Sequence, residues 1–181
     1  MRERTLTSRH VSIYGIFVAL AIVFGYVEHL IPLPIGIYGI KLGLSNIVTV
    51  VVLYLFGSVP ALCINTLRVL ISSLLFGNAF SLAYALCGGI ASATVMIAIK
   101  KLPSIGITGV SIAGGVTHNI AQLAVAVLLL DELKIAFYLP VLLAAGAITG
   151  FIIGAVAMPV VRNRYLKKLS QGLSKNKEKG D

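Results

Sequence analysis

Apolar residues fill six segments of the chain, each close to the length that a membrane-crossing helix needs. The segments are 11–31, 42–57, 59–76, 79–99, 107–130 and 136–161. An α-helix rises about 1.5 Å per residue, so roughly 20 residues cross a hydrocarbon core of about 30 Å. The short connections after the second and third segments indicate antiparallel hairpins. The pattern therefore predicts an all-α membrane protein, a bundle of six transmembrane helices.

The composition agrees with a location in the cell membrane as a multi-pass protein. Hydrophobic residues make up 58% of the chain, charged residues make up 12%, and the mean hydropathy is +0.99. A soluble domain of 181 residues could not bury so much apolar surface. The first apolar segment is longer than the apolar part of a signal peptide, which predicts an uncleaved first span.

Basic residues predict the orientation, because cytoplasmic segments of membrane proteins are enriched in Lys and Arg. Most of the 15 Lys and Arg residues fall on one side if both termini are cytoplasmic, while Asp131 and Glu132 fall on the other. We expect a basic cytoplasmic N-terminus over residues 1–10, a transmembrane domain over 11–161, and a basic tail over 162–181. The tail is expected to be a short helix end followed by disorder, near anionic headgroups. Membrane orientation explains the net charge, so no nucleic-acid partner is expected.

Three of the apolar segments carry polar residues at helical spacing. In the third segment, Asn65 and Ser72 share a helical face with Arg68. The other two stripes comprise Lys41, Ser45 and Thr49 with Asn46, and Ser111, Gly114, His118 and Gln122 with Gly115 and Asn119. A cation inside a membrane helix costs at least about 2.5 kcal/mol, so it is kept where it faces protein or a wet cavity. The stripes therefore predict an inward-facing polar cavity.

The cavity residues suggest a ligand, although other roles stay open. Only Glu28 falls close enough to pair with the basic groups, and surplus positive charge favours a ligand with anionic or carbonyl groups. Alternatively, Arg68 bonds to helix-end carbonyls and serves only the fold. His118, Asn119 and Gln122 would then be interhelical hydrogen-bonding groups without a ligand.

Several reaction classes lack their motifs in this sequence. There is no GxxxxGK[ST] loop for ATP, no cluster of Asp or Glu for a Mg²⁺-diphosphate site, and no Ser-His-Asp or Cys-His set. Cys63 and Cys87 have no metal-ligand spacing and are expected to be small buried residues. We therefore expect no enzymatic activity, no metal and no cofactor.

Small residues recur every four positions in two of the segments. Gly146, Gly150 and Gly154 do so in the sixth segment, and Gly15 and Ala19 in the first. Such spacing lets another backbone approach closely, either within the bundle or from a partner membrane protein. The connection over residues 31–40 contains two prolines and two glycines, and is either a lid over the bundle or a plain apolar loop.

Three stretches resemble the Gx transporter family, which is often labelled heptaprenyl diphosphate synthase component I. They are KLGLSNIVTV at 41–50, LRVLISSLLFGN at 67–78 and VSIAGGVTHNIAQL at 110–123. The family is grouped with the substrate-binding S components of energy-coupling factor (ECF) transporters, six-helix proteins with both termini inside. The resemblance implies that fold, and it implies uptake of a small anionic or amphiphilic vitamin or precursor. It also implies docking onto a transmembrane coupling protein that two ATPases energise.

Carried over to this chain, the resemblance implies docking through Gly15 and Ala19. It implies a substrate pocket drawing on Lys41, Asn46, Arg68, Asn78, His118, Asn119 and Gln122. An alternative is a non-catalytic membrane subunit that serves isoprenoid or quinone synthesis, and a third is a scaffold without a ligand. A prenyl-chain-elongating enzyme needs aspartate-rich Mg²⁺ sites, which this sequence lacks, so the enzyme label of the family implies no activity here.

Overall fold

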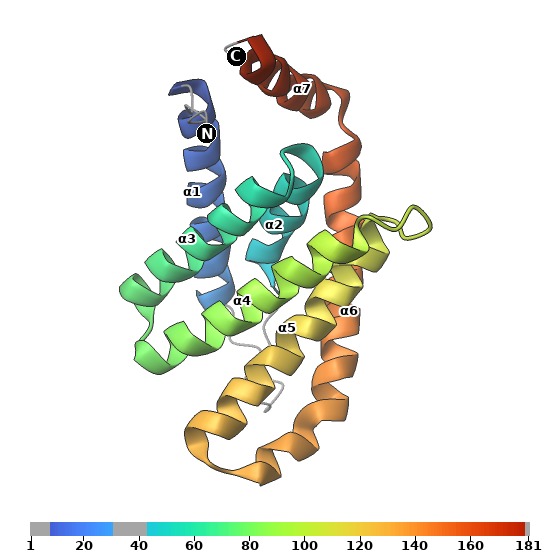
Figure 1. Ribbon diagram of the computed structural model, residues 1–181. Coiled ribbons are helices and arrows are strands. Elements are labelled where there is room, and N and C mark those ends of the chain that lie inside the picture. Colours follow the sequence, from blue (N-terminus) through green and yellow to red (C-terminus); the bar gives the residue numbers. More distant parts are fainter. Residues whose placement is uncertain (1–7, 31–42, 180–181) are drawn as a thin grey trace.

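The computed structural model describes residues 8–30 and 43–179, and over these residues the chain is a helical bundle (Figure 1). Its elements are α1 (Ser8–Leu30), α2 (Leu44–Leu55), α3 (Ser58–Phe76), α4 (Ala79–Ile99), α5 (Ile107–Leu130), the 3₁₀-helix η1 (Leu133–Tyr138), α6 (Leu139–Arg162) and α7 (Arg164–Lys179). Five of the described helical segments are long and apolar enough to cross a membrane. The all-α membrane class predicted from the sequence is therefore confirmed.

The second predicted segment, 42–57, forms a helix that is shorter than a membrane span. Its helix, α2, has only 12 residues, and a glycine with positive φ flanks each end: Gly43 at 73° and Gly57 at 97°. Such φ values suit glycine but not other residues, so they interrupt the helix. A helix of this length spans about 18 Å, short of a hydrocarbon core of about 30 Å.

The short helix α2 forms the centre of the core. It packs against α1, α3 and α6, and seven of its residues are buried: Ser45, Val48, Thr49, Val50, Val51, Val52 and Leu53. A helix buried on most of its circumference is apolar on most faces, which matches this sequence. The remaining helices follow in order around it, with α3 against α4, α4 against α5, and α5 against α6.

Helices α5 and α6 approach each other through glycines. A Cβ atom added at Gly146 would lie 2.7 Å from the backbone oxygen of Gly115, and one at Gly154 would lie 2.6 Å from Cα of Thr108. Gly150 meets the backbone of α5 in the same way. All three glycines of α6 are buried, so in the structure they bring two helices of the bundle together.

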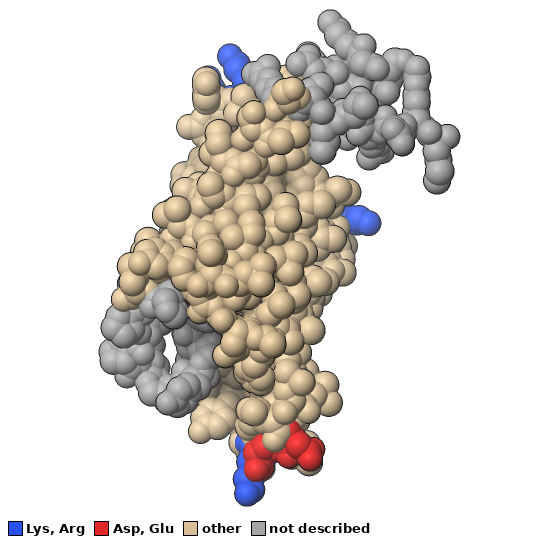
Figure 2. Space-filling model, turned by 90° about the vertical axis from the view of Figure 1, so that its left-hand side faces the viewer, with Lys and Arg blue, Asp and Glu red and all other residues tan. Residues whose placement is uncertain are grey.

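The outer surface of the bundle is largely apolar, as a surface in contact with lipid would be. Figure 2 shows a broad face without charged side chains, and acidic atoms at the end where α5 meets η1, the position of the exposed Asp131 and Glu132. Cys63 and Cys87 lie on the outer surface as free, exposed cysteines. The expectation that they are buried was wrong, because each lies on the helix face turned away from the bundle.

The basic tail forms a helix rather than a disordered segment. Asn163 separates α6 from α7, and its side-chain oxygen accepts a 2.9 Å hydrogen bond from the backbone N–H of Tyr165 at the start of α7. Leu166, Leu169 and Leu173 recur at helical spacing, and Leu173 is only 2% exposed. The disorder expected after residue 162 was therefore wrong over α7, because an apolar stripe packs it against the bundle. Figure 1 shows α7 at the same end of the bundle as the start of α1.

Candidate functional site

Arg68 reaches from α3 to the first turn of α2. Its Nη1 donates a hydrogen bond to Oγ of Ser45 at 2.6 Å, and its Nη2 donates to Oδ1 of Asn46 at 2.8 Å. Its Nε and Nη2 also donate to Oδ1 of Asn65, at 3.2 and 2.9 Å. The acceptors are side chains of the polar stripes on α2 and α3, not helix-end carbonyls. These bonds use four of the five N–H groups of the guanidinium.

Asn65 links the guanidinium to a deeper part of the core. Its side chain is 2% exposed, and Oδ1 also lies 3.4 Å from Oγ1 of the buried Thr49, within reach of a hydrogen bond. A buried network whose members satisfy one another holds its helices in one arrangement, since breaking any bond leaves a polar group unpaired in a low-dielectric interior. The network therefore fixes α2 against α3.

Glu28, near the end of α1, faces the same region. Its Oε1 accepts a 2.5 Å hydrogen bond from the backbone N–H of Gly43, just before α2. The N-terminal end of a helix favours a nearby negative charge. Glu28 and Arg68 also line one cavity, and their opposite charges attract each other. The carboxylate thus lies at the start of α2 and lines the same cavity as the guanidinium.

Gly43 has a conformation and a setting that suit glycine alone. Its φ is 73°, and an added Cβ atom would lie 2.9 Å from Cδ1 of Ile153 on α6. A non-glycine residue in this left-handed conformation costs roughly 1–2 kcal/mol before any clash. Glycine at this position therefore allows the start of α2 to pack against α6 and to donate its hydrogen bond to the carboxylate of Glu28.

Two small cavities adjoin this network. One has a volume of about 60 Å³ and is lined by Glu28, Gly43, Ser45, Asn46, Arg68, Val69, Ala85, His118 and Gln122. The other has a volume of about 30 Å³ and is lined by Gly43, Asn46, Gly115, His118, Asn119, Gln122, Thr149 and Ile153. The two cavities are neighbours, because four residues line both of them, among them Asn46 and His118. Together they have room for a few water molecules.

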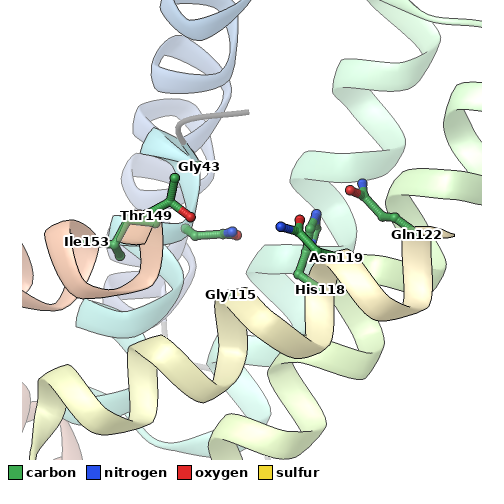
Figure 3. A pocket seen from close by; sticks show the side chains of 8 residues that line it. Gly43, Gly115, His118, Asn119, Gln122, Thr149 and Ile153 are labelled. Atoms are coloured by element: carbon green, nitrogen blue, oxygen red, sulfur yellow. The ribbon is translucent and has the colours of Figure 1, made fainter. Parts of the chain in front are cut away.

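Polar groups from α5 form one side of the second cavity (Figure 3). His118, Asn119 and Gln122 lie along α5, with Thr149 and Ile153 on α6 and Gly43 at the start of α2. The amide nitrogen of Asn119 donates a 2.7 Å hydrogen bond to the backbone oxygen of Leu142 on α6, which fixes the orientation of its side chain. The cavity is therefore surrounded by amide, imidazole and hydroxyl groups.

The structure brings together most of the pocket residues expected from the sequence. Asn46, Arg68, His118, Asn119 and Gln122 all line one or both cavities. Gly43, Thr149 and Ile153 line the cavities although they were not expected there, and Glu28, expected near the basic groups, lines one of them. The periodicity of a single helix predicts neither a positive φ at a glycine nor which other helices, here α1 and α6, contact the site.

One expected pocket residue lies elsewhere, and another is outside the described residues. Asn78 is exposed and caps α4: its Oδ1 accepts a 2.8 Å hydrogen bond from the backbone N–H of Ser81, and the Ser81 hydroxyl accepts one from the backbone N–H of Asn78. It lines neither cavity. The spacing of Asn78 and Ser81 is that of a capping box and could have shown this from the sequence. Lys41 and the connection over 31–40 lie outside the described residues.

The residues expected to dock a partner lie on the outer face of α1. Gly15 and Ala19 are both exposed, and a Cβ atom added at Gly15 would have no neighbour within 4 Å. Large apolar residues beside them, Ile16 and Val23, are 66% and 54% exposed. This face is therefore open in the structure and is not used for packing within the bundle.

No cluster suited to a metal ion is found over residues 8–30 and 43–179, where no three His, Cys, Asp or Glu side chains gather. The polar groups of the cavities are instead mostly neutral hydrogen-bonding groups. Binding of a solute through hydrogen bonds is the chemistry that this set offers.

Comparison with known protein families identifies the family of the chain. The family described as heptaprenyl diphosphate synthase component I matches residues 17–160, which include all six apolar segments in large part. Comparisons with curated proteins and with solved structures gave no significant match. Because the match covers well over half of its length, the chain belongs to the heptaprenyl diphosphate synthase component I family.

Proposed function

We propose that this protein is the substrate-binding component of an ECF-type membrane transporter and takes up a small vitamin or precursor. The observation that carries the proposal is the polar cavity beside Arg68, inside a bundle whose outer surface is apolar. Ionisable groups within a membrane bundle are costly and typically mark the path or site of a solute. The resemblance to the Gx transporter family and its grouping with S components support the same assignment.

The architecture fits a six-helix component if α2 is the sixth membrane helix. A helix shorter than the bilayer is tolerated where protein surrounds it, and α2 packs against α1, α3 and α6. Six helices place both termini on one side of the membrane. The basic residues Lys100, Lys101 and Arg162 then lie on the cytoplasmic side, and Asp131 and Glu132 on the outer side.

The energy for uptake would come from partners, because the sequence has no phosphate-binding loop of its own. We propose that a transmembrane coupling protein docks on the open face of α1 around Gly15 and Ala19, and that two ATPase subunits drive it. Small residues on an exposed helix face allow a second helix to approach closely. The open surface at Gly15 supports this position for the contact.

Co-expression with a coupling protein and two ATPases of an ECF module tests the proposal. The wild-type protein should purify with all three and support ATP-driven uptake in proteoliposomes. Gly15→Leu and Ala19→Leu should fold, since both sites are exposed, but should abolish assembly. Ala124→Leu, at an exposed alanine of α5, is the matched control and should assemble normally. Failure of the wild-type protein to assemble refutes the transporter, and normal assembly of both α1 variants refutes the docking site.

The family description favours a second candidate function, a non-catalytic membrane subunit that serves isoprenoid or quinone synthesis. It would bind a lipid diphosphate through Arg68 and Lys41. A diphosphate carries at least two negative charges, and the negative Glu28 beside Arg68 opposes it. Mg²⁺-dependent prenyl transfer by the protein with a soluble partner subunit, lost in Arg68→Ala, would establish this function instead.

A further inference from the structure

The Lys, Arg, Asp and Glu side chains that the structure describes in the cavity lining balance each other. Over the described residues, Arg68 is the one cationic Lys or Arg side chain of the lining and Glu28 the one carboxylate. An anionic solute would add an unbalanced negative charge to these described side chains. Burying an unpaired charge costs several kcal/mol, so the balance of the lining opposes an anion.

Arg68 has few donors left for a solute. Four of its five N–H groups already point at Ser45, Asn46 and Asn65. Binding a carboxylate or phosphate through two parallel hydrogen bonds needs two free donors on one side of the guanidinium. The guanidinium therefore affects solute binding indirectly, by orienting the side chains that accept its hydrogen bonds.

The hydrogen bonds within the chain decide which amide atoms remain available. Oδ1 of Asn46 accepts from Arg68, so its Nδ2 is the group left to donate into the cavities. Nδ2 of Asn119 donates to the backbone oxygen of Leu142, so its Oδ1 remains as an acceptor. The buried Gln122 adds a further amide to both cavities. The site thus offers a fixed donor and a fixed acceptor, both uncharged.

From these contacts we propose that the cavities bind the uncharged polar end of a solute, and that Glu28 is the residue that excludes anions. The solute class is a carboxamide, a lactam or a nitrogen heterocycle that presents a donor and an acceptor side by side. The volumes of about 60 and 30 Å³ suit a polar group that replaces a few waters, not a whole solute. The inference rests on the proposed function. It narrows the proposed solute to one with an uncharged polar end.

Matched pairs of small molecules test the inference with the full chain in lipid nanodiscs. The probes are nicotinamide and nicotinate, benzamide and benzoate, and thymine and orotate, each titrated to millimolar concentration with binding followed by calorimetry. The wild-type protein should bind the uncharged member of at least one pair more tightly than the carboxylate member. Glu28→Gln, which keeps the acceptor for the N–H of Gly43, should shift that preference toward the carboxylate by about tenfold.

Two further variants test whether the preference depends on the carboxylate of Glu28 and on the amide nitrogen of Asn46. Glu132→Gln removes an exposed carboxylate far along the chain and should leave the preference unchanged. Asn46→Asp keeps the acceptor for Arg68 but loses the donating nitrogen, so it should abolish binding of the uncharged probe. Tighter binding of the carboxylate by the wild-type protein, no binding of any probe, or an unchanged preference in Glu28→Gln overturns the inference.

The same variants separate this inference from the proposed function. Glu28→Gln and Asn46→Asp leave the outer face of α1 untouched, so both should still assemble with the coupling protein and the ATPases. If the proteins assemble but the wild type prefers the carboxylate probe, only the proposal of an uncharged solute is refuted. Loss of assembly in the wild-type protein refutes the transporter itself.

Discussion

The ammonium group of Lys100, just past the end of α4, donates a 2.7 Å hydrogen bond to the backbone oxygen of Leu53 in the last turn of α2. It also lies 5.0 Å from the centre of the Tyr54 ring. The last carbonyl groups of a helix lack partners within it, and a cation is favoured beside them. The contact therefore ties the central helix to α4 at the end away from the cavities.

Lys100→Met should destabilise the protein, because it removes the hydrogen-bond donor to the Leu53 carbonyl of α2 but keeps a side chain of similar length. A hydrogen bond to a charged group contributes roughly 1.5–3 kcal/mol, and we expect a loss at the lower end since Lys100 is only half-buried. The free energy of unfolding in mixed micelles measures it. Lys101→Met, at the exposed neighbour, is the control and should change that free energy by less than about 0.5 kcal/mol. Equal effects of the two substitutions would contradict the cap.

The stability that Lys100 contributes should depend on pH in the alkaline range. Burial lowers the pKa of Lys100 below its usual 10.5, because the charged form loses hydration. Between that lowered pKa and about 10.5 the unfolded chain holds more protons than the folded chain, so this contribution to stability rises with pH. The difference in unfolding free energy between wild type and Lys100→Met should therefore grow through this window. A difference that stays flat or shrinks would contradict it.

Gly150→Ala should separate α5 from α6. An added Cβ atom would lie 2.7 Å from the backbone oxygen of Ser111 and 2.7 Å from Cα of Ile112, and backbone atoms cannot rotate away as a side chain can. Overpacking of this kind typically costs about 1–3 kcal/mol, measurable as a lower unfolding free energy in micelles. Gly106→Ala, where the added atom has no neighbour within 4 Å, is the control and should cost less, since it only replaces glycine by alanine at the N-cap of α5. A neutral Gly150→Ala would mean that the two helices do not touch there.

The sequence predicts the helices well, because lipid imposes a length and an apolar surface that can be counted along the chain. The segments predicted at 59–76, 79–99 and 107–130 agree with α3, α4 and α5 to within one residue. The short α2 is harder to predict, since its buried apolar sequence resembles a full span and only the flanking glycines limit it. The helix α7 could have been found from the spacing of Leu166, Leu169 and Leu173.

The site is predicted less completely than the helices. Periodicity shows that Arg68 shares a face with Asn65, and that His118 shares one with Gln122, because each pair lies on a single helix. It does not show which helices those faces meet. The sequence predicts that Glu28 lies near the basic groups, but the hydrogen bond from Gly43 to Glu28, between residues 15 positions apart, is visible only in the fold.

The balance between Arg68 and Glu28 predicts an unequal response to removing either charge. Arg68→Met removes the hydrogen bonds of the guanidinium to Ser45, Asn46 and Asn65 and leaves the Glu28 carboxylate without a cation in its cavity, so it should cost roughly 3 kcal/mol. Glu28→Gln should cost less, because Arg68 keeps its hydrogen bonds to Ser45, Asn46 and Asn65. The double variant should recover at least about 1 kcal/mol relative to the sum of the single changes.

Unfolding free energies of the four proteins in the same micelles measure this coupling. Arg68→Lys is a useful fifth protein, since it keeps the charge near Glu28 but cannot reach all the acceptors of the guanidinium fork. It should be more stable than Arg68→Met and less stable than the wild type. Strictly additive effects of Arg68→Met and Glu28→Gln would show that the two charges do not interact. The Glu28 carboxylate would then not offset the charge of the guanidinium, and the positive charge of Arg68 would remain available to an anion.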